Sequence, residues 1–428
     1  LMRIFTTHNN VAEFEPQGPE DVEMAQQATD YVNYVFNKQN NGFKILYDVF
    51  KDALISKTGI VKHFWEEKEE ISTENYENLT EMEYQSILAN DDLEVIQHTE
   101  IVVMKQQVDD YGNLVSPKIV EHDVKVKKTK KDGQVRIVSV PPEEFLVSRR
   151  ATSIEDASFV CHRVKKTVSD LILEGYPKDL VEDLPTYTQN NAEYNEERQA
   201  RFSFDEDSGP DDEGKGPSRK VWLEECYMHI DYDGDGIAEL RKITKGGSII
   251  LDNEEIDSIP FSTICPLPIP HKFHGMSIAD TVEDIQLIKS TIMRNLLDNM
   301  YLTNNARYAV LAGQVELDDL LSSKPGGIVR MRAPGAVTAL PTPQIQPYAF
   351  QMVQYLDGIR EERSGVSKMT QGLNPDVLNS HVTSGAISAA TESSMQRIEL
   401  IARMFAETGI KDLFRNIYAL VQRYEDRK

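Results

Sequence analysis

The chain has 428 residues, enough for two or three domains with a sizeable core. Its 46 basic and 70 acidic residues give a formal net charge of −24. This acidic excess argues against a protein that binds nucleic acid tightly over most of its surface. It fits either a highly soluble protein or a surface along which DNA slides. Three widely spaced cysteines without a CxxC pair predict neither a disulfide framework nor a zinc knuckle, and no apolar run approaches the roughly 18 residues of a membrane span.

The first part of the chain alternates between helical and strand patterns. Apolar residues at three- and four-residue spacing predict helices over 20–38 and 43–56. The β-branched and aromatic residues of 60–65 predict a strand, and 93–140 reads as a strand meander. Its turns are predicted at 109–113 (DDYGN) and 130–134 (KKDGQ), the second being the stronger signal because Asp-Gly is typical of two-residue hairpins.

A dense basic cluster flanks the second predicted hairpin. Its members are Lys125, Lys127, Lys128, Lys130, Lys131 and Arg136. Such a cluster can contact DNA or an acidic neighbour, or it can keep a solvated hairpin from pairing with the edge of another sheet. The second interpretation is favoured.

The middle of the chain changes character at 189–219. Residues 193–213 hold nine acidic side chains against two arginines, so we expect an exposed acidic loop there.

A second β region is predicted over 221–251. The clearest helix follows at 277–303, where apolar residues form one stripe and Ser277 is the expected N-cap. The stripe consists of Ile278, Val282, Ile285, Ile288, Ile292, Leu296 and Met300.

The remainder of the chain is mainly helical with one interruption. Short strands are predicted at 307–312 and 326–331, before a proline-rich exit. A second helix is predicted over 347–363, then a polar loop over 366–384, then a long helical pattern over 386–425 with a bend at Thr408-Gly409.

One motif has the spacing of metal ligands. Asp231, Asp233 and Asp235 alternate before Gly236, as in the opening of a calcium loop, and Glu239 lies at the ninth position. However, Lys242 stands at position twelve, where a helix–loop–helix calcium site needs a bidentate glutamate. The flanks also read as strands. Two interpretations therefore stay open: a β-hairpin with a polar turn, which is favoured, or a structural Ca²⁺ or Mg²⁺ site.

Three segments resemble the portal-protein family of tailed bacteriophages, most closely its short-tailed branch. They are VPPEEFLVSRRATSIEDASFVCHR (140–163), DYDGDGIAELRK (231–242) and PHKFHGMSIADTVEDIQLIKSTIMRNLLDNMYLTNN (270–305). The resemblance implies an α+β portal fold that forms one subunit of a ring. Its parts would be a wing over 1–276 with the acidic loop 189–219, stem helices at 277–303 and 347–364, a small α/β clip over 304–346, a tunnel loop over 365–384, and a long wing helix over 385–428 that leads into a helical crown.

The same resemblance implies the function. About twelve copies, in the family's pattern, would form a channel at the capsid vertex of the virion for double-stranded DNA during packaging and ejection. The ring would assemble in the host cytoplasm and dock terminase, tail adaptor, capsid and scaffolding proteins. The tunnel loop would present Lys368, Asn374, Asn379, Ser380, His381 and Thr383 to the DNA.

No common catalytic motif is present, since the sequence contains no GxxxxGK[ST], GxSxG, HExxH or GxGxxG. We therefore expect a protein that is not an enzyme and requires no cofactor. Two alternatives are kept: a calcium-stabilised scaffold or adhesion protein built around the Asp231–Asp235 hairpin, and a metal-dependent nuclease that uses the same carboxylates.

Overall fold

The computed structural model describes residues 1–6, 10–90, 93–104, 107–108, 114–116, 119–185, 201, 216–305, 307–322, 324, 326–341, 348–366 and 396–425. It is an α+β protein, as expected. The chain divides into two compact units. The larger unit contains residues 2–51, 59–264 and 406–428, and the smaller unit contains residue 1, 52–58 and 265–405.

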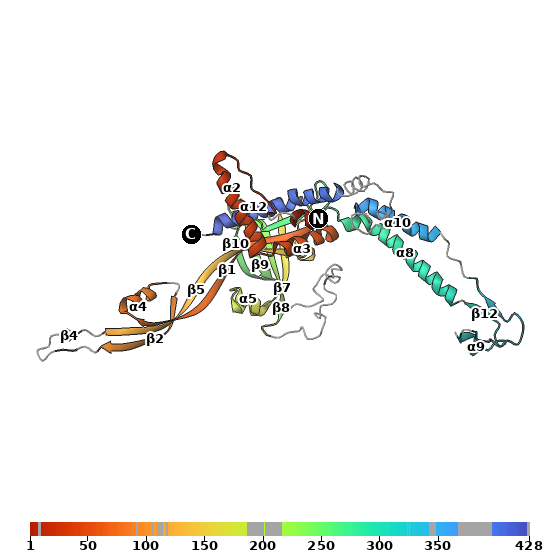
Figure 1. Cartoon of the computed structure of the whole chain (residues 1–428), viewed down its shortest axis with the longest axis horizontal. Coiled ribbons are helices and arrows are strands. Elements are labelled where there is room, and N and C mark those ends of the chain that lie inside the picture. The colour runs from red at the N-terminus through yellow and green to blue at the C-terminus, as the bar shows by residue number, and fades with distance from the viewer. Residues whose placement is uncertain are drawn as a thin grey trace, which may run out of the picture. The chain divides into compact units, whose positions relative to one another are not determined.

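The larger unit contains a four-stranded antiparallel sheet in the order β11-β1-β5-β2. Its strands are β1 (Gly59–Leu79), β2 (Leu93–Met104), β5 (Ile119–Val140) and β11 (Phe261–Ile264). β1 and β5 pair along almost their whole lengths and form a long ribbon, and β2 widens its distal part (Figure 1). Next come β3 (Gln107–Val108) and β4 (Leu114–Ser116), which pair on either side of the predicted turn at 109–113. That turn lies outside the described residues.

The predicted Asp-Gly hairpin at 130–134 is wrong. β5 runs straight through this segment, with Asp132 opposite Lys68 and Gly133 opposite Glu67 of β1. The glycine is explained by Trp65, because a Cβ on Gly133 would lie 2.2 Å from Cζ2 of the Trp65 indole. Trp65 in turn stacks on Tyr424, with ring centroids 5.6 Å apart. The glycine thus allows an indole to approach a strand closely, and it does not form a turn.

The basic cluster therefore does not flank a hairpin. Its first three lysines lie where β5 pairs with both β1 and β2, so protection of a sheet edge is excluded for them, whereas Lys130, Lys131 and Arg136 lie where β5 pairs with β1 alone. Two of its lysines meet glutamates on the neighbouring strands. Lys127 Nζ lies 3.5 Å from Glu94 Oε2 on β2, and Lys128 Nζ lies 3.2 Å from Glu74 Oε1 on β1. These partly exposed ion pairs match charge across the ribbon and contribute little stability each.

We expect Gly133→Ala to lower the free energy of unfolding by about 1–3 kcal/mol, because the added methyl group has no space beside Trp65. Urea denaturation followed by Trp65 fluorescence, in a Trp222→Phe background, would measure the change. Gly358→Ala is the control, since nothing lies within 4 Å of a Cβ added there, and it should be neutral or slightly stabilising. An unchanged midpoint for Gly133→Ala would contradict the packing explanation.

Helices from both ends of the chain pack with one another beside this sheet. They are α1 (Met2–Thr6), η1 (Pro19–Asp21), α2 (Val22–Tyr34), the π-helical turn η2 (Val35–Gln39), α3 (Gly42–Ser56) and α12 (Lys411–Tyr424). Phe36 and Phe414 place their rings 5.1 Å apart, joining the N-terminal and C-terminal helices. The buried Asn40 side chain donates to Val135 O and accepts from Ile137 N, which ties the end of η2 to β5.

The predicted bend at Thr408-Gly409 corresponds to a π-helical turn, η8 (Ala406–Ile410), directly before α12. A Cβ on Gly409 would lie 2.2 Å from Ile264 Cγ1. The glycine therefore allows this turn to lie directly against β11.

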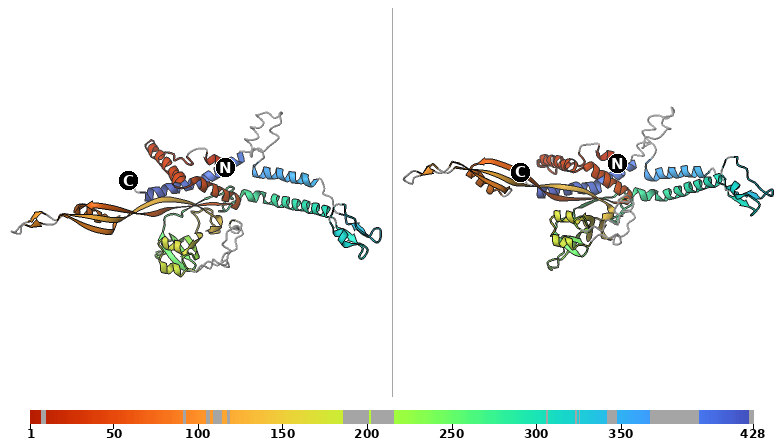
Figure 2. Two further views of the ribbon diagram at one scale, coloured as in Figure 1. Left: turned by 60° about the horizontal axis from the view of Figure 1, so that its bottom comes forward. Right: turned by 90° about the horizontal axis from the view of Figure 1, so that it is seen from below.

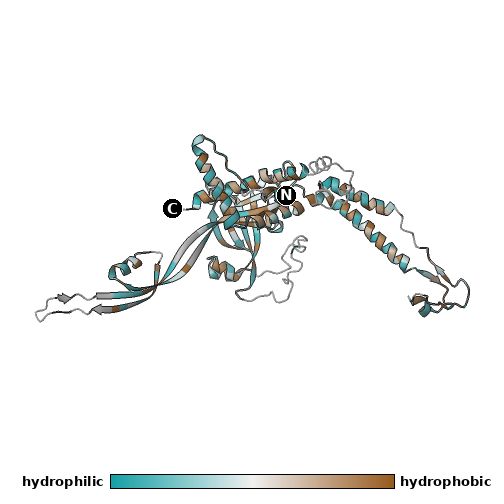
Figure 3. Ribbon diagram, in the orientation of Figure 1, coloured by the Kyte–Doolittle hydropathy of each residue, from teal (hydrophilic) through white to brown (hydrophobic). Residues whose placement is uncertain are grey.

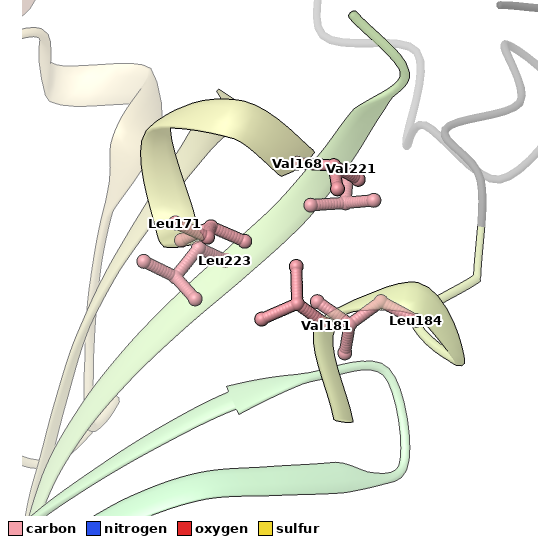
Figure 4. Packing of buried hydrophobic residues seen from close by; sticks show 6 residues of the cluster. All are labelled: Val168, Leu171, Val181, Leu184, Val221 and Leu223. Atoms are coloured by element: carbon pink, nitrogen blue, oxygen red, sulfur yellow. The ribbon is translucent and has the colours of Figure 1, made fainter. Parts of the chain in front are cut away.

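The larger unit also contains a five-stranded sheet in the order β10-β9-β8-β7-β6. The strands are β6 (Phe145–Val147), β7 (Phe159–Thr167), β8 (Lys220–Ile230), β9 (Glu239–Gly246) and β10 (Ile249–Glu255), and η3 (Pro142–Glu144) precedes them. α5 (Val168–Leu173) and α6 (Lys178–Glu182) bury apolar side chains against this sheet, as Figure 4 shows. The cluster consists of Val168, Leu171, Val181, Leu184, Val221 and Leu223. The predicted β region at 221–251 is confirmed, and the acidic segment 189–219 lies largely outside the described residues.

The smaller unit is built on two long helices, α8 (Ile278–Asn304) and α10 (Tyr348–Ser364). They lie side by side in every view (Figure 1, Figure 2). α8 begins at the predicted cap: Ser277 Oγ accepts from the backbone N–H of Asp280, and the Asp280 carboxylate accepts from the backbone N–H of Ser277. Both predicted helices are therefore present, each shifted by one residue at most at either end.

The segment between these helices contains β12 (Tyr308–Val310), α9 (Leu317–Leu321) and β13 (Val337–Ala339). The first predicted strand is present, but the second is wrong, because β12 pairs with β13 and not with 326–331. Gly326 has a φ of +77°, and Arg330 is held by Asp319 through Nε–Oδ2 and Nη2–Oδ1 contacts of 2.6 and 3.1 Å. Residues 327–330 form no strand, and Met331 pairs only in an isolated bridge with Val315.

Candidate functional site

The two long helices of the smaller unit bury little of their apolar surface within the subunit. Ile285 on α8 and Leu356 on α10, each 4% exposed, are the buried residues of these helices. Large apolar side chains elsewhere on both helices are between 43% and 65% exposed, and Figure 3 shows hydrophobic residues distributed along both. They are Leu287, Ile288, Met293, Leu297, Met300 and Tyr301 on α8, and Tyr348, Phe350, Met352 and Tyr355 on α10.

Ion pairs fix the relation between the two helices. Asp284 on α8 accepts two hydrogen bonds from Arg363 Nη1, at 2.9 and 2.8 Å. Lys289 Nζ lies 2.6 Å from Asp357 Oδ1. From the first pair to the second, the residue number rises on α8, from 284 to 289, and falls on α10, from 363 to 357. The two helices are therefore antiparallel.

The face of α8 that packs on α10 is therefore defined, and part of the apolar surface lies elsewhere. At 3.6 residues per turn, Leu287 and Tyr301 are about half a turn away from the buried Ile285, and Leu297 is about a third of a turn away. Together with Arg294 and Asp298 they form what we call the outer face of α8. Of the predicted stripe, Ile285 is buried, while Ile288 and Met300 are 46% and 52% exposed. The stripe prediction missed Leu287, Leu297 and Tyr301, although their spacing of ten and four residues is visible in the sequence.

A large exposed apolar surface on paired helices is typical of a contact with another protein chain. Monomeric soluble proteins rarely expose contiguous apolar patches of more than a few hundred Å². The exposed side chains on α8 and α10 also include three methionines and three tyrosines, residue types that are enriched at protein interfaces. We therefore regard the exposed surface of α8 and α10 as the candidate functional site.

The predicted tunnel loop lies almost entirely outside the described residues. This applies to Lys368, Asn374, Asn379, Ser380, His381 and Thr383. On its N-terminal side, Gly365 ends α10 with a φ of +71°. Arg397 beyond the loop donates from Nη1 to the Glu362 carbonyl at 2.7 Å. The ends of the segment are thus joined, and the roles of its residues stay a prediction.

The Asp231–Asp235 motif forms the turn of the β8–β9 hairpin, as the favoured interpretation predicted. Oxygens of Asp231, Asp233 and Asp235 lie within 4.8 Å of one another, and all three residues are exposed. The carboxylates accept backbone N–H groups of the loop, Asp231 from both Gly234 and Gly236. Glu239 does not join this group, since its Oε2 accepts from Arg241 Nη1 at 2.9 Å. Binding of Ca²⁺ or Mg²⁺ here stays a prediction.

A buried charged cluster joins the two sheets of the larger unit. Lys62 on β1 is hydrogen-bonded to Glu225 on β8. His162 on β7 lies between two carboxylates, with Nδ1 3.7 Å from Glu225 Oε2 and Nε2 3.8 Å from Glu144 Oε2. The side chains of all four residues are 12% exposed.

The pKa values of this cluster follow from its opposite charges. Burial alone would raise the pKa of Glu225, but His162 and Lys62 outweigh it and hold this pKa well below its usual range. Burial would lower the pKa of His162, but Glu144 and Glu225 outweigh it and raise that pKa. The side chains are enclosed between two sheets, so the arrangement is that of a structural ion-pair network.

Comparison with known protein families gives a match over the whole chain. The family model described as the phage SU10 portal protein matches residues 1–428, the whole chain. No curated protein matches significantly. Within the described part of the chain, no helix combines the length and apolar character that crossing a membrane requires.

Proposed function

Because the chain belongs to the family of the phage SU10 portal protein, a structural component of the phage capsid, we propose that it forms a ring of about twelve copies around a channel for double-stranded DNA. The ring would occupy the capsid vertex and serve DNA packaging and ejection. It would dock terminase and the tail adaptor, and it would catalyse no reaction itself.

The exposed apolar surface of α8 and α10 is the observation that supports this proposal. Each of the two helices has a single buried residue within the subunit, so packing inside the subunit does not account for their apolar side chains. Side chains such as Leu287 and Tyr355, which are 63% and 65% exposed, become buried when the same helices of neighbouring subunits pack around an axis. Repetition of one heterologous contact closes a ring when the rotation is suitable.

The parts of the chain then take the following proposed roles. α8 and α10 are the stem helices, and 304–346 is the clip that docks terminase and the tail adaptor. Residues 365–384 are the tunnel loop. The formal charge of −24 per subunit keeps DNA phosphates from binding tightly along the channel, so that DNA can be driven through it.

Negative-stain electron microscopy of the purified protein tests the proposal directly. We expect end-on class averages of rings with a central opening and roughly twelvefold symmetry. If the protein stays monomeric at micromolar concentration even with the phage scaffolding protein present, or forms particles without an opening, the proposed function is wrong.

Deletion of 366–384 should leave ring formation intact, because we place the subunit contacts on α8 and α10, but it should impair DNA packaging. The ring is assayed by microscopy, and packaging by the fraction of capsids that contain DNase-protected DNA. The control for loop closure is a variant in which a flexible Gly-Ser linker of equal length replaces residues 366–384. Failure of the deletion variant to form rings would contradict the assignment of this segment to the channel.

A further inference from the structure

Two histidines and a glutamate come together on one face of the β2–β5 ribbon. His98 and Glu100 are two residues apart on β2, so their side chains lie on the same face. Glu100 is directly opposite His122 of β5 in the antiparallel register. Ligand atoms of these three residues all lie within 4.8 Å of one another. The group lies outside the surface that supports the proposed function.

The histidine rings are held in defined orientations by α4 (Glu81–Leu88). His98 Nε2 lies 2.8 Å from His122 Nδ1, and His122 Nε2 lies 2.7 Å from Glu81 Oε2. Tyr84 stacks on both histidines, with ring centroids at 4.4 and 4.8 Å. His122 is buried, whereas His98 and Glu100 are exposed.

The contact with Glu81 determines which nitrogen of His122 is available as a ligand. A carboxylate accepts only, so Nε2 of His122 carries the proton that it donates to Glu81. Nδ1 of His122 then carries a lone pair that accepts the hydrogen bond from Nε2–H of His98, and a cation bound by both nitrogens displaces that proton. A histidine whose second nitrogen donates to a carboxylate is the usual arrangement around protein-bound zinc, since the carboxylate fixes the tautomer and makes the ligand more basic.

We propose that His98, Glu100 and His122 bind a divalent cation of the zinc class, with Glu81 as the outer carboxylate. Two imidazoles and one carboxylate are ligands that Zn²⁺ accepts, and they leave a fourth position for water. At Zn–N distances of about 2.0–2.1 Å, tetrahedral geometry separates the two nitrogens by about 3.3 Å. The exposed His98 therefore has to move by about half an ångström from its 2.8 Å contact.

The cation would join three elements of the ribbon. β2 contributes His98 and Glu100, β5 contributes His122, and α4 is attached through Glu81. Among the described residues, β2 and β5 are also joined by backbone pairing, by Val95 opposite the buried Val126, and by the exposed pair of Lys127 and Glu94, whose Nζ–Oε2 distance is 3.5 Å. The metal site thus clamps the distal part of the ribbon, in a role separate from DNA passage.

Isothermal titration with Zn²⁺, and the visible d–d absorption of bound Co²⁺, test the site on the full chain. We expect one Zn²⁺ per chain at this site. His98→Ala and Glu100→Gln alter exposed side chains and should fold normally, yet each should weaken binding by more than about 100-fold, and Glu81→Gln by about 10–100-fold.

The controls separate this site from other groups that bind metal. Glu94→Gln removes an exposed carboxylate from the same strand, His271→Ala removes an exposed histidine elsewhere, and Asp231→Asn with Asp233→Asn removes the acidic loop. All three should keep the tetrahedral Co²⁺ spectrum. Absence of Zn²⁺ binding to the unmodified chain at micromolar concentration, or unchanged binding in His98→Ala and Glu100→Gln, would overturn the assignment. Neither result bears on ring formation.

Discussion

Replacing both Leu287 and Leu297 with aspartate should prevent ring formation and leave the subunit folded. The two side chains are 63% and 47% exposed in the subunit, so the new carboxylates remain solvated there. In a ring they would be buried against the neighbouring subunit without a partner, at a cost of several kcal/mol per charge. Because the same contact recurs between every pair of subunits, the penalty repeats around the ring.

A matched control adds the same charge to the same helix. Gln286→Glu with Asn295→Asp also introduces two carboxylates on α8, at positions that are already polar and exposed, and rings should form. Analytical ultracentrifugation and electron microscopy measure assembly, and circular dichroism checks the fold. Rings from the leucine variant would show that the outer face of α8 is not a subunit contact. Loss of helical signal in that variant would show that these leucines stabilise the subunit itself.

The helices of this chain could be predicted because their signals are local. The 27-residue α8 has regular apolar spacing and a capping box, and both are readable within a few residues of the sequence. Which side of α8 packs on α10 could not be predicted in the same way. That depends on Asp284 meeting Arg363 and Lys289 meeting Asp357, contacts between residues far apart in the sequence.

The strand errors have the same origin. Asp132-Gly133 carries the strongest local turn signal in the meander, yet long-range pairing with β1 and the indole of Trp65 outweigh it. Likewise, His98 and Glu100 form only a weak His-x-Glu pattern. Their relation to His122 depends on the β2–β5 register, which a bulge between Val95 and Gln97 shifts and which the sequence alone does not reveal.

The second large effect is expected at the junction of the two sheets. Lys62→Met should destabilise the larger unit by about 3–5 kcal/mol at neutral pH, because it leaves the Glu225 carboxylate buried with one cationic partner fewer. Methionine keeps most of the volume of the lysine stem, so loss of packing contributes little. Urea denaturation followed by Trp222 fluorescence measures the change, since Trp222 lies on β8, the same strand as Glu225.

The dependence on pH identifies the cause. The folded-state pKa of Glu225 lies below its ordinary value of 4.5, so its contribution to stability is complete above that pH and is lost as the pH falls toward the folded-state value. Without Lys62, one of the two groups that lower this pKa is missing, so the pKa rises and part of the contribution disappears, while His162 maintains the rest. The free energies of unfolding of the unmodified protein and of Lys62→Met should therefore differ most near pH 7, and the difference should start to shrink only as the pH falls below about 4.5.

Two further variants decide whether the unpaired charge is responsible. Adding Glu225→Gln to Lys62→Met removes that charge and should recover much of the lost stability, because both members of a buried pair are then neutral. Lys127→Met breaks the exposed pair with Glu94 and should cost no more than about 1 kcal/mol. A loss for Lys62→Met that does not shrink as the pH falls from 7 to 3, and that Glu225→Gln does not relieve, would mean that the lysine stabilises the junction through its aliphatic stem and not through its charge.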